Sequence, residues 1–275
     1  MSLELQWMDK GRSLVENEKP HKATIKMAKQ KGIIKIQGKI GELSFYTTKD
    51  GNLVREKGGI DAKRIASDPA FKRTRENGAE FGSSASSGKL IRDAFRPLIH
   101  HASDQRVTAR MMKIMTEIKN LDTVSPRGKR NVGIGITNPL SLNLLKGFNF
   151  NIHSVLVSVM YKPFTVDHAT GEISILELNP MNDLTFPEGA THMTIQSAWA
   201  KIDFVAKSKV VEISDPYNGP IDSNTVDVVL TPQQIPSGVG TNFQLLMIEF
   251  FQEVNGVQYT LNNGSFNSAS IIDVY

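Results

Sequence analysis

The sequence predicts an α+β protein, in which a small N-terminal β-meander and several helices precede a C-terminal antiparallel β-sandwich that is immunoglobulin-like in broad architecture. Apolar residues at helical spacing occur mainly in the first half, and strand-like alternation with frequent turns fills the second half. The net charge also reverses, because residues 1–150 contain 28 lysines and arginines against 15 aspartates and glutamates, whereas residues 151–275 contain 4 against 13. We therefore expect two domains of opposite charge that attract each other, within one molecule or between copies.

The composition is that of an ordinary globular protein and excludes every site that needs cysteine. Hydrophobic residues make up 40% and charged residues 22% of the 275 residues, and no apolar run approaches the length of a membrane span. The absence of cysteine excludes disulfides, thiolate metal sites and cysteine nucleophiles. We therefore expect a soluble protein.

The first 26 residues mix acidic and basic side chains and contain no apolar core of signal-peptide length. They follow neither a helical nor an alternating pattern, which predicts a flexible leader over residues 1–26 with Met27 as an alternative start. Because no Sec signal or membrane span is visible, we expect the protein in the cytoplasm, or assembled or exported by a route without an N-terminal signal.

A three-stranded meander is predicted directly after this leader. Residues 34–37 and 43–47 alternate in part, with a Gly-Lys-Ile-Gly turn between them, and Asp50-Gly51 is a turn signal before a third strand at 53–55. Such a small meander needs a packing partner, which we expect the helices to supply.

The first long helix is predicted to begin at Asp68-Pro69, an N-cap followed by proline at the first helical position. Its apolar spacing extends to Phe81, and Glu76 and Glu80 are expected on its outer face. The stretch GSSASSG, residues 82–88, predicts either a break or a close helix crossing, and Pro97 predicts a kink or an early end of the next helix.

The clearest helical pattern follows Ser103, which is the candidate N-cap. Its apolar stripe, interpreted as core, consists of Val107, Met111, Ile114, Met115, Ile118 and Leu121. Its outer face is expected to hold Arg106, Arg110, Lys113 and Glu117.

The stretch SPRGKRNVGIGITNP, residues 125–139, joins the two halves as either a phosphate-binding loop or a linker. It lacks the GxxxxGK[ST] order of a Walker loop and the third glycine of a dinucleotide fingerprint, which favours the linker. Asn138-Pro139 predicts a short helix that Gly147 closes. The expected division is a leader at 1–26, a basic meander and helical domain at 27–131, a linker at 132–147 and an acidic β-sandwich at 148–275.

The acidic half contains about seven predicted short strands. The apolar set of residues 193–206 changes parity after Trp199, which predicts a bulge. Residues 242–251 are apolar on both faces, as at the centre of a covered sheet. Asn255-Gly256 predicts a hairpin that places Val254 opposite Val257 and Phe250 near Leu261.

Three stretches resemble a family of uncharacterised Bacteroidota proteins that begin with a MAKQ-like stretch. They read GKIGELSFYTTKDGNLVREKGG, RIASDPAFKRTRENGAEFG and LLMIEFFQEVNGVQYTLNNGSFNSASI. The resemblance covers nearly all of residues 27–275 and implies a start at Met27 and the two-part layout. Because the family has no known activity, it implies no reaction, cofactor or site residue.

No pattern in the sequence predicts catalytic, cofactor-binding or metal-ligating residues. The six histidines follow no metal-ligand spacing, and the adjacent His100 and His101 are expected to point apart. Asp167 beside His168 resembles half of a catalytic triad without a nucleophile motif. Glu172 and Glu177 fall on opposite faces of a regular strand and form no carboxylate pair.

The leading functional hypothesis is a non-enzymatic structural or interaction protein that self-associates, or binds another protein, through complementary basic and acidic surfaces; a virion-like or cell-surface assembly is one version of it. The second hypothesis is a nucleic-acid-binding protein, and the third is an enzyme whose site is not visible in the sequence. The basic residues proposed to bind nucleic acid or an acidic partner are Lys72, Arg73, Arg75, Arg106, Arg110, Arg127, Lys129 and Arg130.

Overall fold

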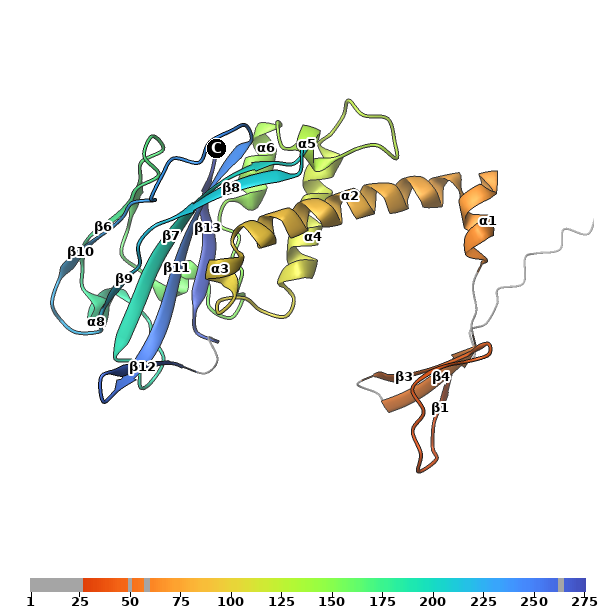
Figure 1. Ribbon diagram of the computed structural model, residues 1–275, viewed down its shortest axis with the longest axis horizontal. Helices are drawn as coiled ribbons and strands as arrows, with labels where there is room; N and C mark the ends of the chain where they lie inside the picture. Colours follow the sequence, from red (N-terminus) through yellow and green to blue (C-terminus); the bar gives the residue numbers. More distant parts are fainter. Residues whose placement is uncertain (1–26, 49–50, 57–59, 262–264) are drawn as a thin grey trace, which may run out of the picture. The chain divides into compact units, whose positions relative to one another are not determined.

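The computed structural model describes residues 27–48, 51–56, 60–261 and 265–275 (Figure 1). The chain divides into two compact units, Met1–Ser67 and Asp68–Tyr275, which are described separately. The leader expected at residues 1–26 lies outside the described residues.

The first unit contains a four-stranded antiparallel sheet in the order β1-β4-β3-β2, followed by a short helix. The hairpin expected around Asp50-Gly51 is confirmed, since Phe45 pairs with Val54 and Thr48 with Gly51, although Asp50 itself lies outside the described residues. Its elements are β1 (Met27–Lys29), β2 (Gly38–Ile40), β3 (Leu43–Thr48), β4 (Gly51–Glu56) and α1 (Ala62–Ser67).

The strand expected at residues 34–37 is wrong. The Gln30 side chain accepts a hydrogen bond from the Ile36 amide at 2.9 Å and donates to the Ile36 carbonyl at 3.2 Å, so it satisfies backbone groups that a sheet partner would otherwise bind. The strand β2 forms instead at the Gly-Lys-Ile stretch that was expected to turn, and β1 pairs along the other edge of β4. No described residue of this unit is buried.

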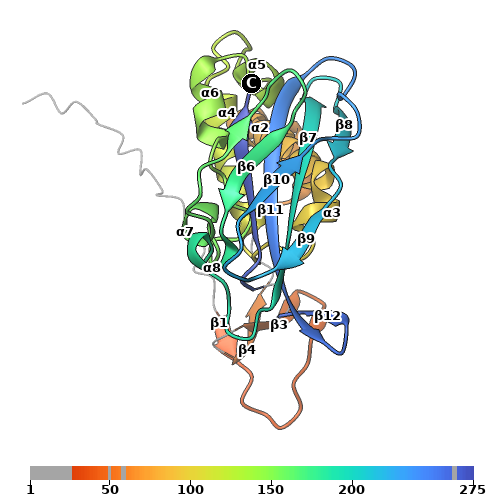
Figure 2. The same cartoon turned by 90° about the vertical axis from the view of Figure 1, so that its left-hand side faces the viewer.

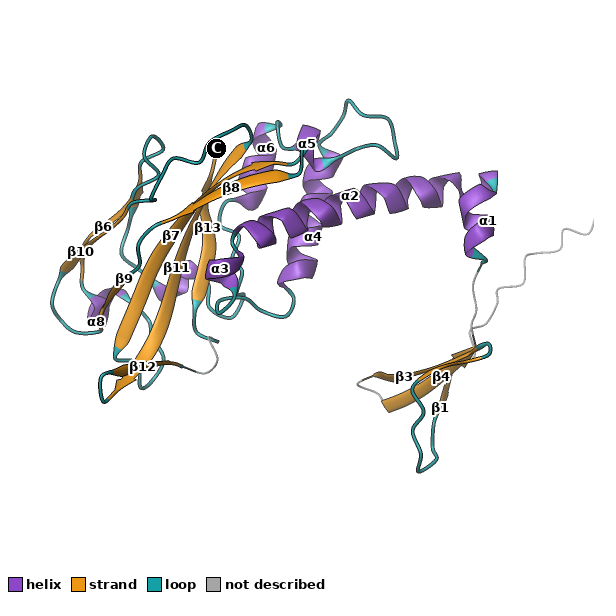
Figure 3. Cartoon of the chain, viewed as in Figure 1, coloured by secondary structure: helices purple, strands orange, loops and turns teal. Residues whose placement is uncertain are grey.

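The second unit has three layers: helices, a six-stranded sheet and a three-stranded sheet (Figures 2 and 3). Its helices are η1 (Pro69–Phe71), α2 (Lys72–Ala94), α3 (Arg96–Ile99), α4 (Val107–Asn120), α5 (Val132–Gly135), α6 (Pro139–Leu145), α7 (Leu156–Val159) and α8 (Pro180–Asp183). The central sheet consists of β7 (His192–Asp203), β8 (Ser208–Ile213), β9 (Tyr217–Pro220), β11 (Thr241–Val254), β12 (Val257–Thr260) and β13 (Ser268–Val274). The outer sheet consists of β5 (Thr165–Val166), β6 (Ile173–Leu178) and β10 (Val226–Leu230), in the order β10-β6-β5.

The strand β11 is apolar on both faces, as expected, because it contributes to two cores. Phe243 and Leu245 pack in a core shared with α2, α3 and α4, whereas Leu246 and Ile248 pack in a core shared with the outer sheet. Successive side chains of a strand point to opposite faces, so the alternation assigns each residue to one core.

The expected division into a helical domain and a separate strand domain is not the one that the structure shows. Met111 of α4 and Phe243 of β11 belong to the same core, and so do Val132, Ile136 and Leu145 from the segment expected to be a linker. The α+β class is confirmed. The immunoglobulin-like sandwich is not confirmed: a three-stranded sheet packs on one face of the central sheet, and helices cover the other face.

The bulge expected in residues 193–206 is wrong. The strand β7 keeps one register against β11 from His192 opposite Phe251 to Ile202 opposite Thr241. The apolar set changes parity because both faces of β7 are covered, one by helices and one by the outer sheet. The hairpin at Asn255-Gly256 is confirmed with Val254 opposite Val257, but the ladder ends before Leu261.

The stretch GSSASSG does not break a helix, because α2 continues through it from Lys72 to Ala94. Its alternative, a close helix crossing, is confirmed: a Cβ atom on Gly88 would lie 3.2 Å from the Met111 side chain and 3.3 Å from that of Met115. Asn138 caps α6 as expected, with its side chain bound to the Leu140 amide. Asp68 also caps a helix, but this is the short 3-10 helix η1, and the long helix α2 begins after it at Lys72. A bend at Phe95 separates α2 from α3, which contains Pro97, as expected.

Candidate functional site

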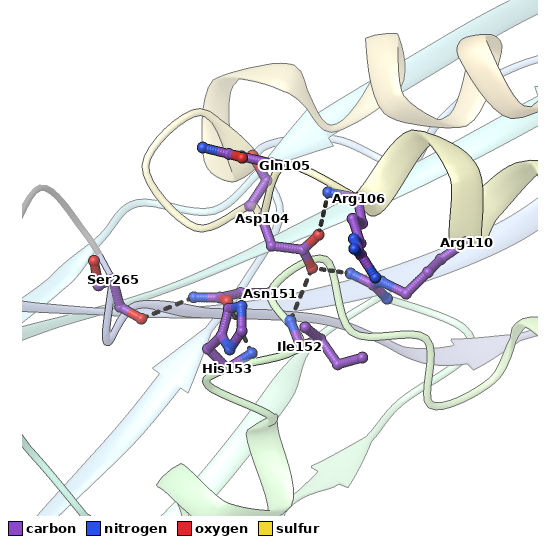
Figure 4. Close-up of a pocket in the computed structure, with 9 residues that line it drawn as sticks. Asp104, Gln105, Arg106, Arg110, Asn151, Ile152, His153 and Ser265 are labelled. Atoms are coloured by element: carbon purple, nitrogen blue, oxygen red, sulfur yellow. Dashed lines mark hydrogen bonds and ion pairs between the residues drawn. The ribbon is translucent and has the colours of Figure 1, made fainter. Parts of the chain in front are cut away.

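A pocket of about 700 Å³ lies at the start of α4. Its walls come from three segments far apart in the sequence: the turn before α4 with the first turn of the helix, residues 151–153, and Ser265 (Figure 4). Sequence reasoning did not find this pocket, because no local pattern brings these segments together.

Asp104 is the centre of the pocket wall. Its Oδ1 accepts a hydrogen bond from the Arg106 amide at 2.6 Å, and its Oδ2 accepts one from the Ile152 amide at 3.0 Å and pairs with Arg110 (Figure 4). Burial opposes ionisation of this carboxyl, but the hydrogen bonds from Ile152, Arg106 and Arg110 hold the pKa of Asp104 below its usual value. Asp104, not the expected Ser103, therefore binds the backbone directly before α4, at the Arg106 amide.

Arg110 is expected on the outer face of its helix, but the structure places it against another segment of the chain. Its Nη1 donates to the Asn149 carbonyl at 2.6 Å and its Nη2 to the Phe150 carbonyl at 3.0 Å, while its guanidinium lies over the Phe148 ring at 5.0 Å. These contacts connect α4 to the segment before α7. The cation is therefore engaged within the fold.

Asn151 completes the wall by holding two chain segments together. Its Nδ2 donates to the carbonyls of Ser265 at 3.0 Å and Asn267 at 2.9 Å, and its Oδ1 accepts from the His153 amide at 3.1 Å. Among the described residues, the side chains of Gln105, Arg106 and His153 make no hydrogen bond. The wall is thus fixed by structural hydrogen bonds, and only a few polar groups remain for a ligand.

A second hollow of about 570 Å³ adjoins this pocket and shares Gln105 and Arg106 with it. It is an apolar groove between α2 and α4, and Phe81 on its rim is 62% exposed. Arg92 on the rim donates to the Thr108 hydroxyl at 2.9 Å. The apolar lining consists of Phe81, Ala85, Gly88, Ala109 and Met112.

The Glu80 carboxylate binds two residues of the basic loop 127–130, Gly128 and Arg130. Glu80 was expected on the outer face of its helix, yet it is only 3% exposed. Glu80 accepts hydrogen bonds from the Gly128 amide at 2.7 Å, from Arg130 at 2.9 Å and from Lys119 at 2.6 Å. The Arg130 hydrogen bond, opposed by burial and helped by the bonds from Lys119 and Gly128, lowers the pKa of Glu80 to about 2.

The eight basic residues singled out from the sequence do not form one face. Arg127 lies 3.6 Å from Glu76 and donates to Asn77 at 3.2 Å, so the loop lies against the first half of α2, where Arg73 also pairs with Glu76. Lys72 and Lys129 are exposed at this end, and Arg75 donates to the Asp68 carbonyl. Arg106 and Arg110 lie instead at the pocket before α4.

Four of the described histidines, His100, His101, His168 and His192, contact a neighbouring polar side chain. His100 and His101 do not point apart, since their ring nitrogens lie 3.2 Å from each other. His168 pairs with Asp273 at 2.8 Å and stacks on Tyr275, while the neighbouring Asp167 bonds Thr170 within its own turn. Within the described part of the chain, no group of three or more histidine or acidic residues could hold a metal ion. No described helix is long and apolar enough to cross a membrane.

A scan against protein-family models found no match, and searches of curated proteins and of solved structures found none either. The resemblance to a Bacteroidota family therefore stays a prediction.

Proposed function

We propose that this chain is a non-enzymatic structural protein that self-associates by stacking two oppositely charged layers of its second unit. The observation that supports it most is the charge of these layers. The helical segment 68–131 contains 13 lysines and arginines against seven acidic residues, whereas residues 160–190 and 215–231, which include the outer sheet, contain eight acidic residues against one lysine. Helices α2 to α6 and the outer sheet cover opposite faces of the central sheet, whereas α7 packs on the side of the outer sheet.

Opposite charge on opposite faces favours contact between different surfaces of two copies. The basic helical layer of one copy is attracted to the acidic outer sheet of the next, and complementary fields raise the rate of encounter. A heterologous contact of this kind closes into a ring or continues as a filament.

Apolar side chains in both layers give such a contact a desolvated centre, which exposed ion pairs alone would not supply. In the helical layer this is the groove beside Phe81. In the outer sheet, Leu176 on β6 is 57% exposed and Val229 on β10 is 51% exposed. A second copy therefore fits the groove in both polarity and charge.

The experiment is multi-angle light scattering of the full chain over a range of concentrations at low and high salt. We expect a mass above that of one chain at low salt, falling towards that of one chain as salt screens the contact. A single-chain mass at every salt and protein concentration would overturn the proposal.

Reversing one charge on each layer tests whether these two surfaces are in contact. Arg106→Glu changes the helical layer and Glu177→Lys changes the outer sheet; both side chains are exposed. Each variant alone should show a smaller assembly mass at low salt than the wild type does. An equal mixture of the two should restore the wild-type mass, because the altered faces attract each other. Lys207→Glu in the turn between β7 and β8 makes the same change in net charge as Arg106→Glu and should leave the association unchanged.

A further inference from the structure

We propose that the four-stranded sheet of the first unit binds the phosphate backbone of single-stranded nucleic acid through one of its faces. This surface is distinct from the layers of the second unit and from the eight basic residues that the sequence had suggested. It follows from the pairing register of β1 to β4, which sorts the side chains by charge.

Directly paired residues of neighbouring strands share a face, and so do residues two apart on one strand. Arg55 pairs with Ser44, and Ser44 pairs with Lys39, which forms one row across the sheet. In the next row, Lys29 pairs with Leu53, and Leu53 pairs with Tyr46. We call this side the basic face, defined by Lys29, Lys39, Ser44, Tyr46, Leu53 and Arg55.

The other side of the sheet carries most of its apolar side chains. Val54 pairs with Ala28 and with Phe45, and Leu43 pairs with Ile40. The single carboxylate among the described strand residues of this unit, Glu56, pairs with Leu43 and therefore also lies on this side. The basic face thus carries three cations and, among the described strand residues, no acidic side chain that would repel a phosphate.

The basic face combines exposed charge with an aromatic ring. Lys29, Lys39 and Arg55 are exposed, and the Arg55 guanidinium lies 5.4 Å from the centre of the Tyr46 ring. Neighbouring strands are about 4.8 Å apart and alternate residues about 7 Å apart, so the backbone positions of the three cations lie roughly 8 to 16 Å from one another. That separation lets each contact a different phosphate of one strand.

These features favour a single strand over other polyanions. A base can stack on a tyrosine–arginine pair whatever its identity, whereas reading a duplex requires an element that enters a groove. A membrane surface would favour apolar side chains that insert between lipids, and in this sheet the larger apolar set lies on the opposite side. The occupant to which we commit is therefore single-stranded DNA or RNA without sequence preference.

The experiment is fluorescence anisotropy of a labelled oligothymidylate of about 15 nucleotides with the full chain, repeated over a salt series. Three phosphate contacts predict a slope of log K against log salt of about −2, at roughly −0.7 for each contact on a single strand. Lys39→Glu combined with Arg55→Glu should weaken binding by at least about tenfold at low salt and flatten the slope.

Two further variants separate charge from folding. Lys39→Arg with Arg55→Lys keeps both charges and should keep the slope, while Lys207→Glu on the second unit should change nothing. No binding at low salt, a slope near zero, or equal binding by the double glutamate variant would overturn the proposal. Tighter binding to a duplex of the same length, or binding only to anionic phosphatidylserine vesicles or to a second copy of the chain, would overturn the assignment to single strands.

Discussion

The Glu80 carboxylate connects three segments that are far apart in the sequence: α2, α4 and the loop before α5. Lys119 is 8% exposed on its side chain, so this pair is largely desolvated, and Arg130 and the Gly128 amide supply the remaining hydrogen bonds. A buried ion pair of this kind is weak evidence for net stability, but removing one partner leaves an uncompensated charge.

Replacing Glu80 by Gln should therefore destabilise the second unit by about 3 kcal/mol, because Lys119 loses its buried counter-charge. Urea unfolding followed by circular dichroism measures the change. The control is Glu117→Gln on α4. Glu117 and Lys113 form an exposed ion pair with 4.0 Å between Oε1 and Nζ, so its loss should lower the free energy of unfolding by less than about 0.5 kcal/mol. A loss below about 1 kcal/mol for Glu80→Gln would contradict the role given to this carboxylate.

The same carboxylate predicts a pH dependence. Its folded pKa of about 2 lies below the ordinary value of 4.5, so the folded state binds this proton more weakly than the unfolded state does. The contribution to stability is complete above about pH 5 and is lost as the pH falls towards 2. Asp104, Asp122 and Asp273 also have lowered pKa values and add to the acid loss.

The contribution of Glu80 to this loss is therefore the difference in free energy of unfolding between the wild type and Glu80→Gln, measured by urea unfolding at several pH values. That difference should shrink between about pH 5 and pH 2. If it stays constant over this range, the carboxylate is not held ionised by its partners.

At the scale of the element, α2 shows how a tertiary contact overrides helix propensity. Its glycines and serines are poor helix formers, yet Ser84, Ser87 and Gly88 are buried in the continuous helix. The small side chains let α4 approach closely, and packing against α4 compensates for the weak propensity of the stretch.

Two glycines of this helix test that explanation. At Gly82 an added Cβ would meet nothing within 4 Å, so Gly82→Ala should stabilise the protein by about 0.5–1 kcal/mol through helix propensity. At Gly88 the neighbouring methionine side chains leave no room for a branched side chain, so Gly88→Leu should cost about 1–3 kcal/mol or more. Thermal unfolding of both variants gives the signs. A neutral Gly88→Leu would contradict the close crossing, and a destabilising Gly82→Ala would contradict the open space at that position.

What could be predicted from the sequence is what neighbouring residues determine. The cap at Asn138 and the hairpin turn at Asn255-Gly256 depend on side chains within a few residues, and the structure confirms them. The burial of Glu80 and the regular register of β7 depend on partners about 40 or more residues away in the sequence. A single sequence does not reveal such partners, which is also why the pocket before α4 was missed.

At the scale of the whole molecule, β11 decides how the chain unfolds. One of its faces packs with the helices and the other with the outer sheet, so neither core is complete without it. A domain of residues 148–275 alone would expose Phe243, Leu245 and Met247, which the helices cover in the intact chain. The helices and the strands are therefore expected to unfold together.

The fragment of residues 68–275 should accordingly fold by itself, because the buried residues of both cores come from this part of the chain. Calorimetry should show one cooperative transition within a few degrees of the main transition of the full chain, with no second transition for the helices. The fragment of residues 148–275 is the matched control. It loses the helices that cover one face of the central sheet and should show exposed hydrophobic surface by dye binding and no cooperative transition. Two separate transitions in residues 68–275, or cooperative unfolding of residues 148–275 alone, would mean that the helical and strand layers are independent bodies after all.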